Sequence, residues 1–314
     1  MSGFEIRDAT AADAPGIRAL FERVFRSPLS DAEWRWKFEQ DPDGWYGVVA
    51  VLDGRVVGNY AGWAMAFVLD EKPGLLYSVG DVATEPSVRG LGGRRGIYRE
   101  MTDAFYARVG RDVPFCFGFP NARALRVSER IVGSRTLMPV GLKIAAVEAF
   151  PRPPADLESG EFVDEAFDSL WESARRRLTH AAVRDRARVN WRFHARPSRY
   201  YRMVWRRQGS ELASWAAVSV VGEEATVADY LGREADGSDL PPLFAAVADE
   251  ARRLGARRLV FWETPGGPGR GPIAALPGDR RDAGFPMIVR VFDDEAVRRF
   301  GAALNLVPSL YDLI

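Results

Sequence analysis

The sequence predicts a mixed α/β fold that is present twice in the chain. Strand-like alternation and helix-like apolar spacing recur in both halves of the 314 residues, a length that suits two domains. A polar stretch with three prolines, residues 148–160, separates the halves and indicates a linker. We therefore expect an N-terminal domain over residues 1–147 and a C-terminal domain over residues 161–314.

An internal repeat supports the duplication. Residues 37–42 align with residues 192–197 at a shift of 155 positions (197 − 42 = 155). At a different shift, residues 79–81 match residues 227–229. The second copy has no counterpart of the Arg- and Gly-rich loop at residues 89–96. We therefore predict one cofactor site, in the first half.

In the first half, Thr10 is a plausible helix N-cap, with Asp13 in the first turn that follows. Asp53 and Gly54 form a hairpin turn signal. Here we expect strands at residues 4–7, 48–51, 56–60, 75–83 and 115–119, and helices at 14–25, 97–109 and 121–131. In the second half, we expect helices at 162–177 and 243–254, strands at 201–206, 213–220, 226–231 and 258–262, and a long loop over 264–284.

The composition argues against several classes of protein. Lys+Arg and Asp+Glu both number 43, so the chain lacks the overall basic field that favours nucleic acid or anionic membranes. Cys116 lies in an apolar run and is expected to be a buried, inert thiol. The chain has one cysteine and two histidines, His180 and His194, which are too few for a conventional zinc site, so none is expected. No apolar run reaches about 18 residues and no signal pattern is present, so we expect a cytoplasmic enzyme.

Residues 79–101 carry the pattern with chemical meaning: a strand ends, and a Gly- and Arg-rich loop opens a helix. Glycines let the backbone approach a ligand, and the N–H groups and dipole of the first helical turn attract an anion. Arg89, Arg94 and Arg95 add positive charge, so the pattern favours a pyrophosphate. It is neither a P-loop, which needs Lys-Ser/Thr after its last glycine, nor a clean dinucleotide-binding motif.

This segment resembles the acyl-CoA-binding motif of the GNAT superfamily of N-acyltransferases, Gln/Arg-x-x-Gly-x-Gly/Ala. Residues 89–93 match its common Arg-Gly-x-Gly opening. Arg94 stands where the motif has Gly or Ala, so a later register that begins at Arg94 stays open. Residues 6–13 resemble the first strand and helix of the family, and residues 117–127 its later strand-to-helix motif, with Asn121 at the usual Asn. The resemblance covers residues 4 to 143.

The resemblance implies a twisted mixed sheet flanked by helices, in which two neighbouring parallel strands splay apart. The pantetheine arm of acyl-CoA would add to the exposed edge, and the second half would be a degenerate copy of the same lobe. The residues implied to bind the cofactor are Val82, Ala83 and Thr84 at the edge, Arg89, Gly90, Leu91, Gly92, Gly93, Arg94, Arg95 and Gly96 around the pyrophosphate, and Asn121.

Members of the family generally use direct attack of the amine on the thioester, which needs a neutral amine and an acid for the leaving thiolate. Asp81 is the first candidate for the base or amine anchor, and Glu85 is the second. The alternative for either is a structural contact with arginine or backbone. Ser128 stands where relatives carry the tyrosine acid, and Tyr98, Tyr60 or solvent are the candidates to replace it.

We expect an N-acyltransferase that moves an acyl group, most often acetyl, from acetyl-CoA or another acyl-CoA to a small-molecule or peptide amine, without a metal. One alternative is a non-catalytic CoA-binding protein, and another is a transferase that binds its acceptor between two lobes. No nucleic-acid or membrane partner is expected, and a homodimer stays open. The aromatic residues that line either an acceptor pocket or the core are Trp34, Trp36, Trp45, Tyr46 and Trp63.

Overall fold

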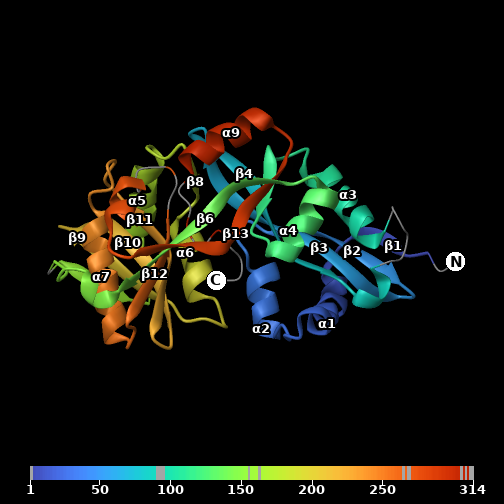
Figure 1. Ribbon diagram of the computed structural model, residues 1–314, viewed down its shortest axis with the longest axis horizontal. Coiled ribbons are helices and arrows are strands. Elements are labelled where there is room, and N and C mark those ends of the chain that lie inside the picture. Colours follow the sequence, from blue (N-terminus) through green and yellow to red (C-terminus); the bar gives the residue numbers. More distant parts are fainter. Residues whose placement is uncertain are drawn as a thin grey trace. The chain divides into compact units, whose positions relative to one another are not determined.

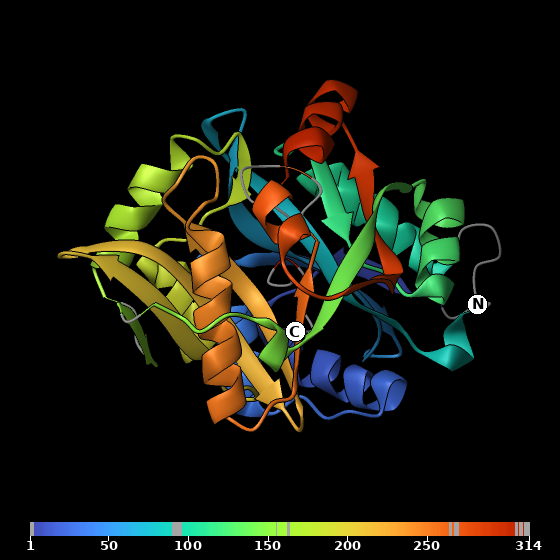
Figure 2. The same ribbon diagram turned by 60° about the vertical axis from the view of Figure 1, so that its left-hand side comes forward.

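The computed structural model describes residues 3–89, 96–154, 156–161, 164–263, 266, 270–304, 307 and 310. The chain packs into two compact units, each assembled from separate segments (Figure 1, Figure 2). Unit 1 comprises Met1–Met65, Leu75–Leu137 and Met287–Val297, and unit 2 comprises Ala66–Gly74, Met138–Pro286 and Arg298–Ile314. Among the described residues, no helix is both long and apolar enough to cross a membrane.

The sheet of unit 1 follows the order β1-β2-β3-β4-β5-β13. Its strands are β1 (Glu5–Asp8), β2 (Trp45–Leu52), β3 (Arg55–Leu69), β4 (Lys72–Thr84), β5 (Phe115–Gly118) and β13 (Asp279–Val291), of which the outer ends of β3, β4 and β13 belong to unit 2. β1, β2 and β3 pair antiparallel, β4 and β5 pair parallel, and residues 288–291 of β13 pair antiparallel with β5. A strand from the far end of the chain thus completes this mixed sheet.

Two helices cover opposite faces of the unit 1 sheet. Helix α1 (Ala14–Phe25) packs over Val49, and helix α3 (Ile97–Val109) packs over Val48; neighbouring strand residues face opposite ways. The predicted apolar stripe of α3 is confirmed, because each of its members is at most 1% exposed: Ile97, Met101, Phe105 and Val109. The remaining helices here are the short 3-10 helices η1 (Ala11–Asp13) and η3 (Pro86–Val88), α2 (Asp31–Trp34), the π-helix η2 (Arg35–Glu39), α4 (Ala122–Val127), the π-helix η5 (Ser128–Val132) and the start of α9 (Asp294–Ala303).

The sheet of unit 2 follows the order β6-β12-β11-β10-β9-β7. Its strands are β6 (Arg135–Ala146), β12 (Arg258–Trp262), β11 (Glu224–Gly232), β10 (Glu211–Val221), β9 (Arg202–Gln208) and β7 (Leu157–Gly160), and the start of β6, up to Leu137, belongs to unit 1. β8 (His180–Ala182) pairs with the last residues of β3. Its helices are the 3-10 helix η6 (Val147–Ala149), α5 (Ala166–Arg175), α6 (Arg186–Val189), the π-helix η7 (Asn190–His194), α7 (Leu240–Arg253), α8 (Arg270–Ala275) and the end of α9.

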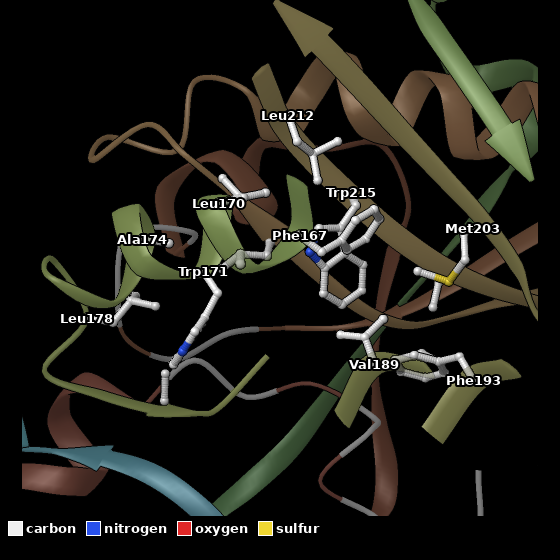
Figure 3. Packing of buried hydrophobic residues seen from close by; sticks show 14 of the residues in the cluster. Phe167, Leu170, Trp171, Ala174, Leu178, Val189, Phe193, Met203, Leu212 and Trp215 are labelled. Carbon is white, nitrogen blue, oxygen red and sulfur yellow. The ribbon is translucent and has the colours of Figure 1, made fainter. Parts of the chain in front are cut away.

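Helices α5 and α7 cover the two faces of the unit 2 sheet. Phe167 of α5 lies against Trp215 of β10, in a cluster that also contains Leu231 (Figure 3). On the other face, Phe244 of α7 packs against Tyr230 at 5.4 Å between ring centroids. Unit 2 therefore repeats the helix–sheet–helix layering of unit 1.

The internal repeat is confirmed by an uncommon local structure. The π-helix η2 begins at Arg35 and η7 begins at Asn190, again 155 residues apart (190 − 35 = 155). π-Helices are rare, and two at matched positions indicate one ancestral element. The preceding helices α2 and α6 are capped alike: Ser30 accepts from the Glu33 N–H, and Asp185 accepts from the Arg188 N–H.

Two details of the sequence interpretation have clear outcomes. The hairpin turn is confirmed, because Asp53 and Gly54 have φ values of 50° and 74° between β2 and β3. The long loop expected over 264–284 is wrong in part, because α8 and the start of β13 lie within it. Pro272 lies in the first turn of α8, where a missing N–H is tolerated.

Candidate functional site

Strands β4 and β5 of unit 1 part after a short stretch of parallel pairing. Their register joins Tyr77 to Cys116 and Ser78 to Phe117, and no later pair occurs among the residues that the structure describes. β4 nevertheless runs on to Thr84. Such a parting leaves N–H and C=O groups of β4 without a strand neighbour on that side, and an extended ligand can add to an edge of this kind.

Asp81 kinks the part of β4 that extends beyond β5. Its φ is +48°, in the left-handed region that few non-glycine residues adopt. Lys37 Nζ lies 2.6 Å from Asp81 Oδ2, and Asn59 Nδ2 donates to the Asp81 carbonyl at 3.0 Å. The kink is therefore held through both its side chain and its backbone, and it sets the direction of residues 82–84.

Lys37 belongs to this site, although the sequence analysis did not select it. Its side chain is 9% exposed, and its ammonium lies 4.4 Å from the centre of the Trp63 ring, within cation–π range. A lysine in an aromatic helical run usually packs its stem and keeps its charge in water. The one clue to Lys37 in the sequence was its position between Trp36 and Phe38, which are both buried in the structure.

Three buried polar atoms of β3 and β4 have no hydrogen-bond partner within the described part of the chain. They are Asn59 Oδ1, Trp63 Nε1 and Thr84 Oγ1. Buried polar groups in folded proteins are normally satisfied. These atoms therefore mark a region in which a polar ligand or water fits.

Helix α3 begins with its first-turn amides uncapped. Gly96 is the N-cap, and no side chain of the described residues bonds to that turn. Arg89 Nε donates to the Thr84 carbonyl at 3.1 Å, so the chain turns back directly after β4. The predicted loop residues Gly90, Leu91, Gly92, Gly93, Arg94 and Arg95 lie outside the described residues. Uncapped amides and the helix dipole together make a site for an anion.

The family model of an acetyltransferase (GNAT) domain matches residues 5–144. Residues 5–144 therefore form a GNAT domain. A search of curated proteins found no match. The match includes the kinked strand β4, the start of α3 and the Asn121 helix, which are the parts of the GNAT motif that the sequence indicated.

Solved structures show the GNAT fold over nearly the whole chain. One is a probable N-acyltransferase from Enterococcus faecalis V583, with 12% identity and a TM-score of 0.73, covering 95% of this chain and 74% of that one. A tandem GNAT protein from the clavulanic acid biosynthesis pathway has 14% identity and a TM-score of 0.56, covering 92% and 99%. Saccharomyces cerevisiae N-myristoyltransferase with bound myristoyl-CoA has 10% identity and a TM-score of 0.58, covering 93% and 84%.

These likenesses concern the fold, and with the internal repeat they identify a duplicated GNAT architecture. The GNAT acetyltransferase domain makes this chain an acyl-CoA-dependent N-acyltransferase. The alternative of a non-catalytic CoA-binding protein is not favoured.

Glu85, the second candidate base of the GNAT domain, is engaged by two arginines. Its carboxylate lies 3.4 Å from Arg23 Nη2 and 3.1 Å from Arg55 Nη1. Its backbone N–H donates to the Val57 carbonyl at 2.9 Å. Glu85 thus anchors the end of β4, and its carboxylate is already committed to two cations.

Asn121 and Ser128 lie at the two ends of helix α4. Asn121 Oδ1 accepts from the backbone N–H groups of Arg123 and Ala124 at 3.1 and 3.0 Å, so its side chain is an N-cap. Ser128 begins η5, and its hydroxyl lies 2.9 Å from that of Ser134. Both polar side chains are therefore used in holding this helix in place.

Of the tyrosines named as replacement acids, Tyr60 is buried and Tyr98 is half-buried. Tyr60 and Tyr106 share a hydrogen bond of 2.7 Å between their hydroxyls, and burial raises the pKa of both well above the ordinary value. Burial also raises the pKa of Tyr98 to about 12. All three hydroxyls stay protonated at neutral pH. Among the candidate acceptor-pocket aromatics, Trp34, Trp36 and Trp63 are buried, while Trp45 and Tyr46 are half-buried.

Two other residues that the sequence analysis selected, Cys116 and His180, lie in the protein interior. Cys116 is 1% exposed, and burial raises the pKa of its thiol, so the prediction of a buried thiol is confirmed. His180 is 3% exposed, and its Nδ1 accepts from the Asp70 N–H at 3.3 Å. No group of three potential metal ligands occurs in the described ranges.

Proposed function

We propose that the GNAT domain transfers an acetyl group from acetyl-CoA to a primary amine of a small molecule or peptide. The observation that supports this most is the uncapped start of α3 beside the parted edge of β4. In this proposal the pyrophosphate lies at the α3 amides, with Arg89 and Gly96 as the described ends of its loop. The pantetheine arm lies along Val82, Ala83 and Thr84.

The described residues fit such a co-substrate. An extended amide chain needs strand-like donors and acceptors, which the edge of β4 offers. Thr84 Oγ1 is buried and without a partner among the described residues, so it suits a polar group of the arm. The S. cerevisiae N-myristoyltransferase of similar fold holds myristoyl-CoA, which supports a CoA thioester here.

In the proposed reaction, the amine nitrogen attacks the thioester carbonyl carbon, the new C–N bond forms, and the C–S bond breaks. A backbone N–H in residues 82–84 polarises the carbonyl oxygen. Asp81 anchors the amine and takes its proton, while Lys37 holds the carboxylate at the kink. Ser128 is engaged by Ser134, so the thiolate takes its proton from solvent.

The test is CoA release from acetyl-CoA, followed with a thiol reagent over a panel of primary amines. We expect saturable release with at least one amine, and Asp81→Asn should lower kcat by about 10²- to 10⁴-fold while CoA affinity by calorimetry stays the same. Glu85→Gln is the matched control, because the arginines already occupy that carboxylate. No heat with CoA, or full turnover by Asp81→Asn, would contradict the proposal.

A further inference from the structure

Unit 2 contains an open pocket of about 370 Å³ beside the π-helix η7. Glu161 forms one wall, and the other walls come from the segment between Phe193 and Tyr201. Phe193 also packs in the core against Trp215, with ring centroids 6.3 Å apart (Figure 3). The pocket is therefore built on an anchored element, not on a loose turn.

The pocket segment has the opposite charge to its counterpart in the first copy. From the last residue of η2 onward, the first copy carries Glu39, Asp41 and Asp43. At the repeat shift of 155, the second copy carries His194, Arg196 and Ser198. Three acidic positions have thus become basic or neutral in an otherwise matched element. An acidic loop attracts cationic amines, and a basic one attracts anions.

Two arginines of the pocket are held around Tyr201. Arg199 Nε donates to Ser219 Oγ at 3.0 Å, and its guanidinium carbon lies 5.9 Å from the centre of the Tyr201 ring. Arg196 Nη1 donates to the Tyr201 hydroxyl at 3.4 Å. Burial raises the pKa of Tyr201, and these positive charges oppose the rise. The guanidinium groups are pre-placed, which lowers the entropy lost when they bind a ligand.

Glu161 is the acidic residue among the described lining residues, and its charge is compensated. The Tyr200 hydroxyl donates to its carboxylate at 2.9 Å, and Arg202 Nη1 lies 3.9 Å from it. Tyr200 is 56% exposed, so its ring offers a flat face at the mouth of the pocket. With Arg196 and Arg199 against one compensated carboxylate, the pocket has a positive character.

We propose that this pocket binds an oxyanion, a phosphate or carboxylate, carried on a flat ring that stacks against Tyr200. Guanidinium groups match the planar geometry of both oxyanions with charge-assisted hydrogen bonds. The site is formed by residues of unit 2 alone and does not depend on the acyl-CoA site proposed for unit 1. It gives the second copy a binding role for a ligand opposite in charge to an amine.

The test titrates phenyl phosphate, benzoate and benzylamine into the full chain saturated with CoA. We expect the two anions to bind, their ratio showing which oxyanion is preferred, and benzylamine not to bind. Arg196→Gln combined with Arg199→Gln should weaken anion binding by about tenfold or more, the effect of losing a charge-assisted hydrogen bond. Arg257→Gln, on an arginine of unit 2 that is 75% exposed and paired with Glu223, should leave it unchanged.

Glu161→Gln provides a second measurement that does not depend on the fold of the double variant. Removing the one lining carboxylate should strengthen anion binding. Unchanged or weaker binding in Glu161→Gln would overturn the proposal. So would equal losses in the arginine pair and the Arg257 control, or loss of anion binding in Arg89→Ala, which would place the anion at the CoA loop instead.

Discussion

Replacing Lys37 with methionine tests what holds the kink at Asp81. The exchange keeps the length of the side chain and removes an ammonium 2.6 Å from Asp81 Oδ2. Two unit charges at that separation attract by about 6 kcal/mol at an effective dielectric constant of about 20, and desolvation of both ions offsets much of this. The variant leaves a carboxylate side chain that is only 13% exposed without its cation. We therefore expect a loss of about 3 kcal/mol in the free energy of unfolding.

Two substitutions at Asp81 test the effect of its positive φ. Asp81→Asn keeps a side chain that tolerates left-handed backbone, whereas Asp81→Ala should cost about 1 kcal/mol more. In the double variant Lys37→Met with Asp81→Asn, no charge is stranded, so a double-mutant cycle should return a coupling of about 2 kcal/mol. Urea unfolding measures the free energy of unfolding of each variant, provided that the m-value is the same as in the wild type. A cost below about 1 kcal/mol for Lys37→Met, or a coupling near zero, would refute the reasoning.

Three further predictions concern other parts of the structure. A Cβ at Gly118 would lie 3.0 Å from the Val79 carbonyl oxygen, so Gly118→Ala should cost about 1–3 kcal/mol in urea unfolding, and wild-type stability would show that β4 and β5 lie further apart. Asn121→Ala should cost about 1 kcal/mol by loss of the N-cap, and Asn121→Ser should restore most of it in thermal melts; equal losses would argue against capping. Burial lowers the pKa of His180, so the unfolded chain takes up its proton first, and stability should fall as pH drops below about 6.5. The variant His180→Gln should lack that part of the pH dependence in unfolding titrations.

The sequence was sufficient where local chemistry determines structure. The α3 helix was predicted because apolar residues recur every four positions from Ile97 to Val109, and these two residues are the observed ends of the helix. The hairpin at Asp53 followed from turn chemistry alone. The duplication followed from the repeat, since the aromatic run at residues 36–42 reappears at 191–197 and each run lies partly in a π-helix.

The parts that escaped prediction depend on contacts between residues far apart in the sequence. The ion pair of Lys37 and Asp81 joins residues 44 positions apart, and no local pattern marks it. The left-handed backbone of Asp81 is stabilised by Asn59 from another strand, and a strand pattern gives no sign of it. β13 was missed altogether, because Gly284 and Pro286, which lie within the strand, are read as loop residues in isolation.

The second copy shows why one acyl-transfer site is expected in the chain. Asp229 lies three residues before the end of β11, as Asp81 does in β4. Arg184 Nε lies 2.9 and 3.1 Å from the two oxygens of Asp229, and the Tyr230 N–H donates to one of them at 2.7 Å. Arg184 is 2% exposed and Asp229 is 4% exposed, so the pair is enclosed. In the second copy this carboxylate is therefore part of the core.

Substituting each aspartate in turn distinguishes the role of Asp229 from that of Asp81. Asp229→Asn strands the buried guanidinium of Arg184, so it should lower the free energy of unfolding by about 3 kcal/mol. Turnover per folded molecule, measured as CoA release well below the unfolding transition, should match the wild type. Asp81→Asn should instead lower turnover by a large factor. It also costs stability, because it leaves the buried Lys37 ammonium without its carboxylate, so turnover per folded molecule is the quantity that distinguishes the two variants. If Asp229→Asn abolished turnover while the chain stayed folded, the second copy would take part in the chemistry, and a single site in unit 1 would be wrong.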